Sequence, residues 1–129
     1  MNRATIKGKR RGLAVILTLV ALLLLTSTEM ANAAHFTGAC SAELNAVEAA
    51  IEAGTYYGKK AASSESNLLA KLEAAAAKIG LGKFDDAIDK LLDISDKATA
   101  WAGARKPKLD DATGINIAVT NAIGCVGSL

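Results

Sequence analysis

Residues 83–102 read KFDDAIDKLLDISDKATAWA, and the spacing of their apolar side chains decides the class of fold. An apolar residue recurs every three or four positions, so these side chains share one face of a helix. They are Phe84, Ala87, Ile88, Leu91, Leu92, Ile94, Ala98 and Trp101. Asp85 and Asp86 fall in the first turn, where the helix dipole favours anions. The stretch predicts a long amphipathic helix whose broad apolar face packs against other helices.

Two segments before this stretch also have helical spacing, residues 41–53 and residues 66–79. We expect the first to stop at Gly54 and the second at Gly80, because glycine commonly follows the last turn of a helix. Three serines near the start of the second segment offer N-terminal caps: Ser63, Ser64 and Ser66. The apolar faces consist of Leu44, Val47 and Ile51 in the first segment, and of Leu68, Leu69, Leu72, Ala75, Ala76 and Ile79 in the second.

Residues 110–126 fit two structures. Apolar residues have helical spacing along the segment, and Asp110 or Asp111 can cap such a helix. Residues 115–119 also alternate as in a strand, and two glycines weaken a helix by up to about 1 kcal/mol each. A lone strand has no partner in the rest of the chain, so we predict a helix. Its apolar positions are Ile115, Ala118, Val119, Ala122, Ile123 and Val126.

Residues 1–33 have the three parts of a secretory signal peptide. A basic start precedes the apolar run of residues 13–25, and Ala31-Asn32-Ala33 supplies small residues for cleavage. The run is about thirteen residues long, whereas a membrane-spanning helix needs about twenty. We therefore predict cleavage after Ala33 rather than a membrane anchor. The predicted organisation is a signal peptide at 1–33 and a secreted or periplasmic helical domain at 34–129, without stable membrane insertion after cleavage.

Two other leader types stay open. Arg10-Arg11 is typical of twin-arginine export, although the residues that follow match that signal poorly. Thr37-Gly38-Ala39 before Cys40 resembles a lipid-acceptor site, but Cys40 lies far beyond the apolar run. The general secretory route fits the leader better than either alternative.

Removal of the leader reverses the sign of the net charge. The leader holds five basic residues and one acidic residue, so ten Lys and Arg remain against twelve Asp and Glu, a net charge of −2 instead of +2. The domain has no basic stripe and no RNA-reading motif. We therefore predict no nucleic-acid partner.

Cys40 and Cys125 are the only cysteines, and they lie near the two ends of the exported part. An even number of cysteines in an oxidising compartment favours a disulfide, whereas a redox-active pair usually has C-x-x-C spacing. Short links favour antiparallel neighbouring helices. In an antiparallel bundle of four helices, the start of the first helix and the end of the fourth lie at the same end, so the two cysteines can meet. In a bundle of three they would lie at opposite ends. We predict an all-α, small antiparallel four-helix bundle closed by a Cys40–Cys125 disulfide.

Groups able to carry out catalysis are scarce in the exported part. His35 is its only histidine, so a Ser-His-Asp or Cys-His arrangement has no further histidine to use, and C-x-x-C-H haem attachment is absent. The aspartates of the 83–102 helix recur opposite its apolar face, which indicates a solvated stripe. The alternatives are a surface for a weakly bound cation or a basic partner, and a carboxylate active site. We predict no enzymatic activity, no catalytic residues, no metal and no cofactor. The stripe consists of Asp85, Asp89, Asp93 and Asp96.

Two groups of aromatic and basic residues are candidate partner-binding surfaces. The first is Tyr56, Tyr57, Lys59 and Lys60, in the loop expected between the first two helices. Alternatively, one tyrosine covers the end of the bundle and the other has no role. The second is Trp101 with Arg105 and Lys106, although Trp101 lies on an apolar helix face and we expect it to pack in the core.

Residues 67–126 resemble the FIMAH-type helical module of secreted bacterial proteins. The resemblance is carried by Asn67-Leu68-Leu69-Ala70-Lys71-Leu72-Glu73-Ala74-Ala75, by Gly82-Lys83 with Ala87, Leu91 and Ile94, by Ala100 with Gly103, and by Lys108-Leu109 before a last helix. It implies a non-catalytic helical bundle with a binding or spacing role. The link at 103–109 is longer than the module's pattern, and Gly114 and Trp101 also depart from it.

These observations predict an exported, non-catalytic binding or accessory protein of the bacterial envelope or the extracellular space. Its partner would be a protein or a cell-wall polymer. The alternative is a small secreted inhibitor or immunity protein that acts on an extracellular or periplasmic enzyme.

Overall fold

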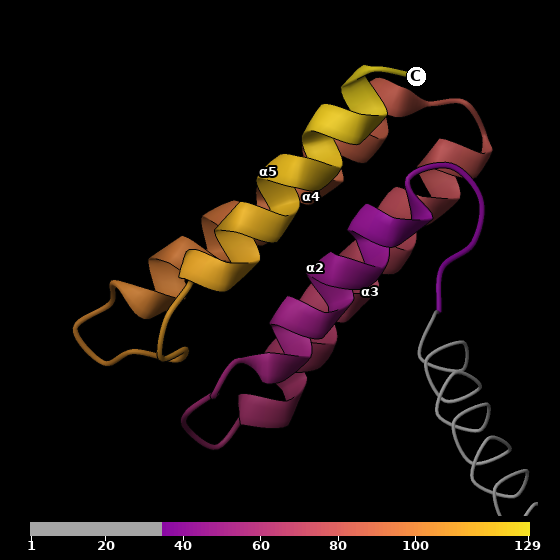
Figure 1. The fold of residues 1–129 in the computed structure, drawn as a ribbon. Coiled ribbons are helices and arrows are strands. Elements are labelled where there is room, and N and C mark those ends of the chain that lie inside the picture. Colours follow the sequence, from indigo (N-terminus) through magenta and orange to yellow (C-terminus); the bar gives the residue numbers. More distant parts are fainter. Residues whose placement is uncertain (1–34) are drawn as a thin grey trace, which may run out of the picture. The chain divides into compact units, whose positions relative to one another are not determined.

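The computed structural model describes residues 35–129, and it confirms the predicted all-α bundle. The four helices of this part are α2 (Ser41–Ala53), α3 (Ala61–Gly80), α4 (Phe84–Ala102) and α5 (Thr113–Gly127) (Figure 1). They belong to one compact unit, Phe36–Leu129. The predicted signal peptide, its cleavage site and the alternative export signal at Arg10-Arg11 lie outside the described residues.

Each helix packs against two neighbours, so the four form a closed ring. The contacts run from α2 to α3, from α3 to α4, from α4 to α5 and from α5 back to α2. Figure 1 shows the resulting arrangement as two adjacent pairs, α2 with α3 and α4 with α5. This is the antiparallel order that short connections between amphipathic helices favour.

The core consists mainly of leucine, isoleucine, valine and alanine. Alanines with 0% exposure on α3, α4 and α5 allow neighbouring helices to approach closely: Ala75, Ala87, Ala98 and Ala122. The largest fully buried side chains come from all four helices and from the loop before α5: Leu44, Ile51, Leu68, Leu72, Leu91, Ile94, Leu109 and Ile115. Full burial of one such side chain contributes about 2 kcal/mol.

The start of α3 differs from the sequence-based expectation. The helix begins at Ala61 rather than Ser66, and no side chain caps its N-terminus. The proposed capping role of Ser63, Ser64 and Ser66 is therefore wrong, because all three lie inside the helix. Ala61 and Ala62 have the highest intrinsic helix propensity, which extends the helix towards Gly58.

The end of α3 depends on Gly82 rather than on Gly80. Gly82 has a φ of +75°, a left-handed conformation that glycine adopts without strain. Its N–H donates to the Ile79 carbonyl at 3.0 Å, and the Lys83 N–H donates to the Lys78 carbonyl at 2.9 Å. This is the Schellman arrangement, which satisfies the last carbonyls of a helix and here starts the turn into α4.

The uncertain last segment is a helix, Thr113–Gly127. The Asp111 carboxylate accepts hydrogen bonds from the Thr113 N–H at 2.9 Å and from the Thr113 hydroxyl at 2.7 Å. These bonds lower the pKa of Asp111. On the other side of α5, Asn116 accepts from the Ser95 hydroxyl at 2.6 Å and donates to the Thr99 hydroxyl at 3.0 Å, which links α5 to α4.

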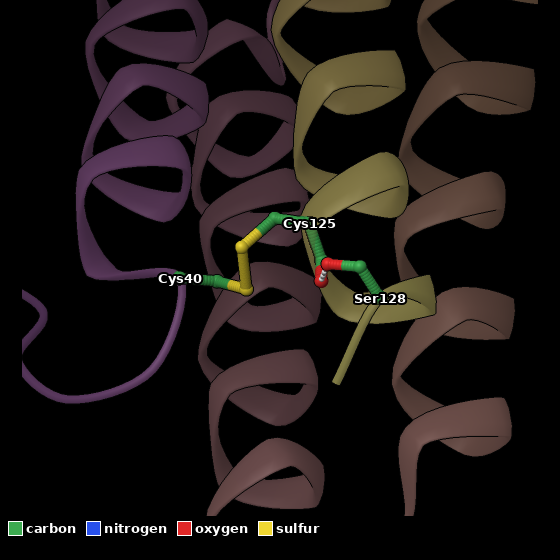
Figure 2. The surroundings of a disulfide bond; sticks show 3 residues. All are labelled: Cys40, Cys125 and Ser128. Atoms are coloured by element: carbon green, nitrogen blue, oxygen red, sulfur yellow. Dashed lines mark hydrogen bonds between the residues drawn. A yellow bond between two sulfur atoms is a disulfide. The ribbon is translucent and has the colours of Figure 1, made fainter.

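The predicted disulfide between Cys40 and Cys125 is present (Figure 2). It joins the residue before α2 to the last turn of α5, with 5.9 Å between the two Cα atoms. In the segment before α2, Phe36 is 7% exposed; the Asn45 side chain accepts a hydrogen bond from the Phe36 N–H and donates one to the Phe36 carbonyl. The segment before α2 is thus part of the folded unit, which supports the four-helix closure inferred from the cysteine positions.

Candidate functional site

The two long loops of the bundle lie at the same end, opposite the disulfide. Residues 54–60 join α2 to α3, and residues 103–112 join α4 to α5 (Figure 1). An isolated antiparallel bridge between Tyr56 and Leu109 connects the two segments. We refer to residues 54–60 and 103–112 as the paired loops.

Backbone hydrogen bonds on both sides of this bridge fix the register of the paired loops. The Tyr57 N–H donates to the Lys108 carbonyl at 3.0 Å, and the Asp110 N–H donates to the Thr55 carbonyl at 3.0 Å. The Asp110 carboxylate also accepts from the Thr55 N–H at 3.1 Å. These bonds hold the backbone of this end in one arrangement.

Leu109 is the apolar centre of the paired loops. Its side chain is fully buried, although it belongs to a loop rich in charged residues. A Cβ atom at Gly54 would lie 2.9 Å from the Leu109 Cδ1 atom. Gly54 therefore does more than follow the last turn of α2, because its missing side chain makes room for Leu109.

Tyr56 closes this end of the bundle from within. Its ring is half-buried, and its hydroxyl donates to the Ile51 carbonyl at 2.7 Å. Burial, together with the carboxylates of Glu65 and Asp110, raises the pKa of Tyr56 to about 12. The Tyr56 hydroxyl is thus occupied by a hydrogen bond within the bundle. Tyr56 packs beneath the loop surface and does not offer its hydroxyl to a partner.

Tyr57 is 47% exposed and lies at a groove of about 300 Å³. Both paired loops and the first turn of α3 line this groove. The lining residues are Tyr57, Gly58, Lys59, Lys60, Ser64, Lys106, Pro107 and Lys108. We call this surface the lysine groove.

The lysine groove concentrates positive charge on an acidic domain. The paired loops hold five of the ten Lys and Arg of residues 34–129 and only two of the twelve Asp and Glu. Those two acids, Asp110 and Asp111, accept hydrogen bonds within or beside the loops. The loops thus have a formal charge of +3 and the rest of residues 34–129 a charge of −5.

The N-terminus of α3 adds to this positive field. No side chain caps its first turn, and Ser64 in that turn lines the lysine groove. Uncapped N–H groups at a helix start carry a partial positive charge. Their effect has the same sign as that of the surrounding lysines.

The structure joins parts of the two surfaces that the sequence treats separately. Tyr57, Lys59 and Lys60 come from the first predicted group, and Lys106 comes from the second. Trp101 instead packs against the core, as expected. Lys108 and Pro107 were missed, because only the pairing of two distant loops brings them to Tyr57. The one sequence signal that could have indicated this pairing is Leu109, an apolar residue within a charged loop, because such a residue tends to be buried.

The acidic face of α4 is used partly for helix packing. Lys71 of α3 pairs with Asp93, and Lys78 pairs with Asp86 at 3.8 Å. The hydrogen bond from Lys71 and the nearby lysine charges hold the pKa of Asp93 below its usual value. Asp89 is exposed. These two ion pairs link α3 to α4, and Asp93 is the only member of the predicted stripe that takes part in them.

One group of potential metal ligands occurs among residues 35–129, and it is at the disulfide. Ligand atoms of Cys40, Glu43 and Cys125 lie within 4.8 Å of one another. Both sulfur atoms are bonded to each other, however. Metal coordination by cysteine requires thiolates, which a disulfide does not provide.

Comparison of the chain with known protein families, with curated proteins and with solved structures finds no match. The resemblance of residues 67–126 to the FIMAH-type module stays a prediction. Within residues 35–129, no helix combines the length and apolar character that crossing a membrane requires.

Proposed function

We propose that this chain is an exported, non-catalytic binding or accessory protein that contacts its partner through the lysine groove. The observation that carries the proposal is the convergence of four lysines and an exposed tyrosine on two hydrogen-bonded loops of an acidic domain. Charged patches of one sign steer oppositely charged partners and raise their association rate.

Three features support an envelope or extracellular location. Residues 1–33 have the pattern of an export signal. The Cys40–Cys125 disulfide is consistent with an oxidising compartment outside the cytosol. The resemblance to the FIMAH-type module of secreted bacterial proteins points in the same direction.

The proposal is tested by comparing what two variants retain from envelope and culture-medium extracts. The groove variant carries Lys60→Glu and Lys106→Glu. The matched control carries Lys83→Glu and Lys90→Glu, two exposed lysines outside the groove, so the net charge changes equally. We expect partner capture by the wild-type protein and the control, and its loss in the groove variant. Equal capture by all three proteins would remove the groove as the binding surface.

The same experiment separates the two functional classes. A captured wall polymer or structural protein indicates an accessory role. A captured enzyme whose turnover falls when the protein binds indicates the alternative, a secreted inhibitor or immunity protein. Mass spectrometry of the exported chain tests the leader, because cleavage after Ala33 leaves a protein that begins at Ala34.

A further inference from the structure

We infer that the lysine groove binds an anionic polysaccharide, with the Tyr57 ring against a sugar face and the lysines against the acidic groups. This inference rests on the proposed function, and it names the chemical class of the partner. It follows from the sign of the charge, the exposure of the lysines and the surroundings of Tyr57.

The charge distribution favours a negatively charged partner that approaches the loop end of the bundle. No acidic residue lines the groove, and the ion pairs between described residues lie elsewhere, between α3 and α4. The rest of residues 34–129 has a charge of −5 and repels the same partner. The net charge therefore favours the approach of an anion at the loop end of the bundle.

The exposure of the lysines favours a polymer over a small ion. All four groove lysines are exposed, and no polar or charged side chain is buried in the described part of the chain. A site for one small anion needs donors that converge in fixed positions. Lysine instead places a hydrated point charge on a flexible stem, which suits repeated charges along a chain.

Tyr57 favours a sugar over an acidic peptide. Its side chain is 47% exposed, and it lines the groove together with Gly58, which has no side chain, and Pro107, so aromatic and apolar surface is available beside the lysines. Proteins recognise peptides through free sheet edges, apolar grooves or arginine clusters. Here the only pairing between the loops is a single isolated bridge, and lysine rather than arginine lines the groove.

The backbone of the groove is already ordered for this contact. The Tyr57 N–H donates a hydrogen bond to the Lys108 carbonyl, and the neighbouring Tyr56 hydroxyl donates one to the Ile51 carbonyl. A ligand that meets a preformed surface does not have to order the loop on binding.

The test measures binding of the purified, disulfide-bonded protein to polygalacturonate, to uncharged dextran and to polyglutamate at low and moderate salt. We expect binding to polygalacturonate that weakens with salt, no binding to dextran, and weaker binding to polyglutamate. Lys60→Gln with Lys106→Gln should weaken polygalacturonate binding roughly tenfold. Tyr57→Ala should weaken it roughly fivefold and leave polyglutamate binding unchanged.

The matched control is Lys83→Gln with Lys90→Gln, and thermal unfolding establishes that each variant is folded. Polyglutamate binding as tight as polygalacturonate binding would overturn the inference in favour of an acidic protein. An equal loss in the control variant would also overturn it, because the binding would then be unspecific charge attraction. If polygalacturonate fails to bind but groove-dependent capture from extracts persists, the polysaccharide is wrong and the proposed function stands. If polygalacturonate fails to bind and no groove-dependent capture from extracts occurs, the proposed function is wrong as well.

Discussion

The two ends of the bundle are closed in different ways. At one end, a covalent bond joins the start of α2 to the last turn of α5, and a short turn at Gly82 joins α3 to α4. At the other end, the paired loops are held by backbone hydrogen bonds around Leu109. The loop end buries Leu109 and presents Tyr57 and four lysines to solvent. One small domain thus closes one end with a covalent bond and the other with a hydrogen-bonded, positively charged pair of loops.

Removal of the disulfide should have the largest effect on stability. The bond closes a loop with a sequence separation of 85, and in the chain-entropy view its loss destabilises the fold by about 4 kcal/mol. We expect this loss in Cys40→Ala with Cys125→Ala, measured by denaturant unfolding against the oxidised wild-type protein. Reduced wild-type protein is the control and should behave alike. A loss below about 1 kcal/mol would show that the helices alone hold this end.

Leu109→Ala should have the second largest effect, at the opposite end. The leucine is fully buried, so truncation leaves a cavity and costs about 3 kcal/mol. Binding at the lysine groove should weaken too, because the paired loops lose their apolar centre. Leu92→Ala is the matched control, since Leu92 is 46% exposed and its truncation should cost less than about 0.5 kcal/mol. Similar unfolding midpoints for the two variants would mean that the loops do not depend on Leu109.

Tyr56→Phe should destabilise the protein by about 1 kcal/mol through loss of the hydrogen bond to Ile51. It should also change the pH dependence. The pKa of Tyr56 is about 12 in the folded protein and 10.0 ordinarily. The unfolded chain therefore loses this proton first, and wild-type stability falls as the pH rises from about 10 towards 12. Tyr56→Phe should lack that contribution to the fall. Phenolate absorbance of the folded protein, with Tyr57→Phe as the control, checks the assignment; titration of Tyr56 near its ordinary pKa would contradict it.

Alanine in place of Gly114 or Gly124 in α5 should have the smallest effect, and it should be stabilising. A Cβ atom at Gly114 or Gly124 would meet nothing within 4 Å, and neither glycine has a positive φ. Each substitution should raise the free energy of unfolding by up to about 1 kcal/mol. Gly82→Ala is the contrasting control, because its φ of +75° strains any residue with a Cβ atom. Destabilisation by both α5 substitutions would contradict the prediction.

The sequence predicted the elements whose signals are local. Apolar spacing placed α2 at Ser41–Ala53 and α4 within one residue of its observed start. It misplaced the start of α3, because alanines next to a loop continue a helix without contributing a distinctive apolar face. The disulfide could be predicted because the number of helices in an antiparallel bundle decides whether the start of the first helix and the end of the last lie at the same end.

Only half of the lysine groove could be predicted. Tyr57, Lys59 and Lys60 are close in sequence and appear as one cluster. Lys106 and Lys108 join them through the Tyr56–Leu109 bridge, and a single bridge between two loops leaves no periodic pattern. The two tyrosines are adjacent and alike in sequence, whereas burial gives them opposite roles. Which of the two tyrosines is buried depends on the packing of the loops, and the spacing of residues in the sequence does not show it.

The position of the disulfide also has a mechanical consequence. Cys40 and Cys125 flank the four helices almost completely. When the chain is stretched from points outside this pair, tension passes from one sulfur atom to the other, and the helices between them carry none of it. The lysine groove lies at the far end of those unloaded helices. A ligand held there should stay bound while the polypeptide on either side of the bundle is under force.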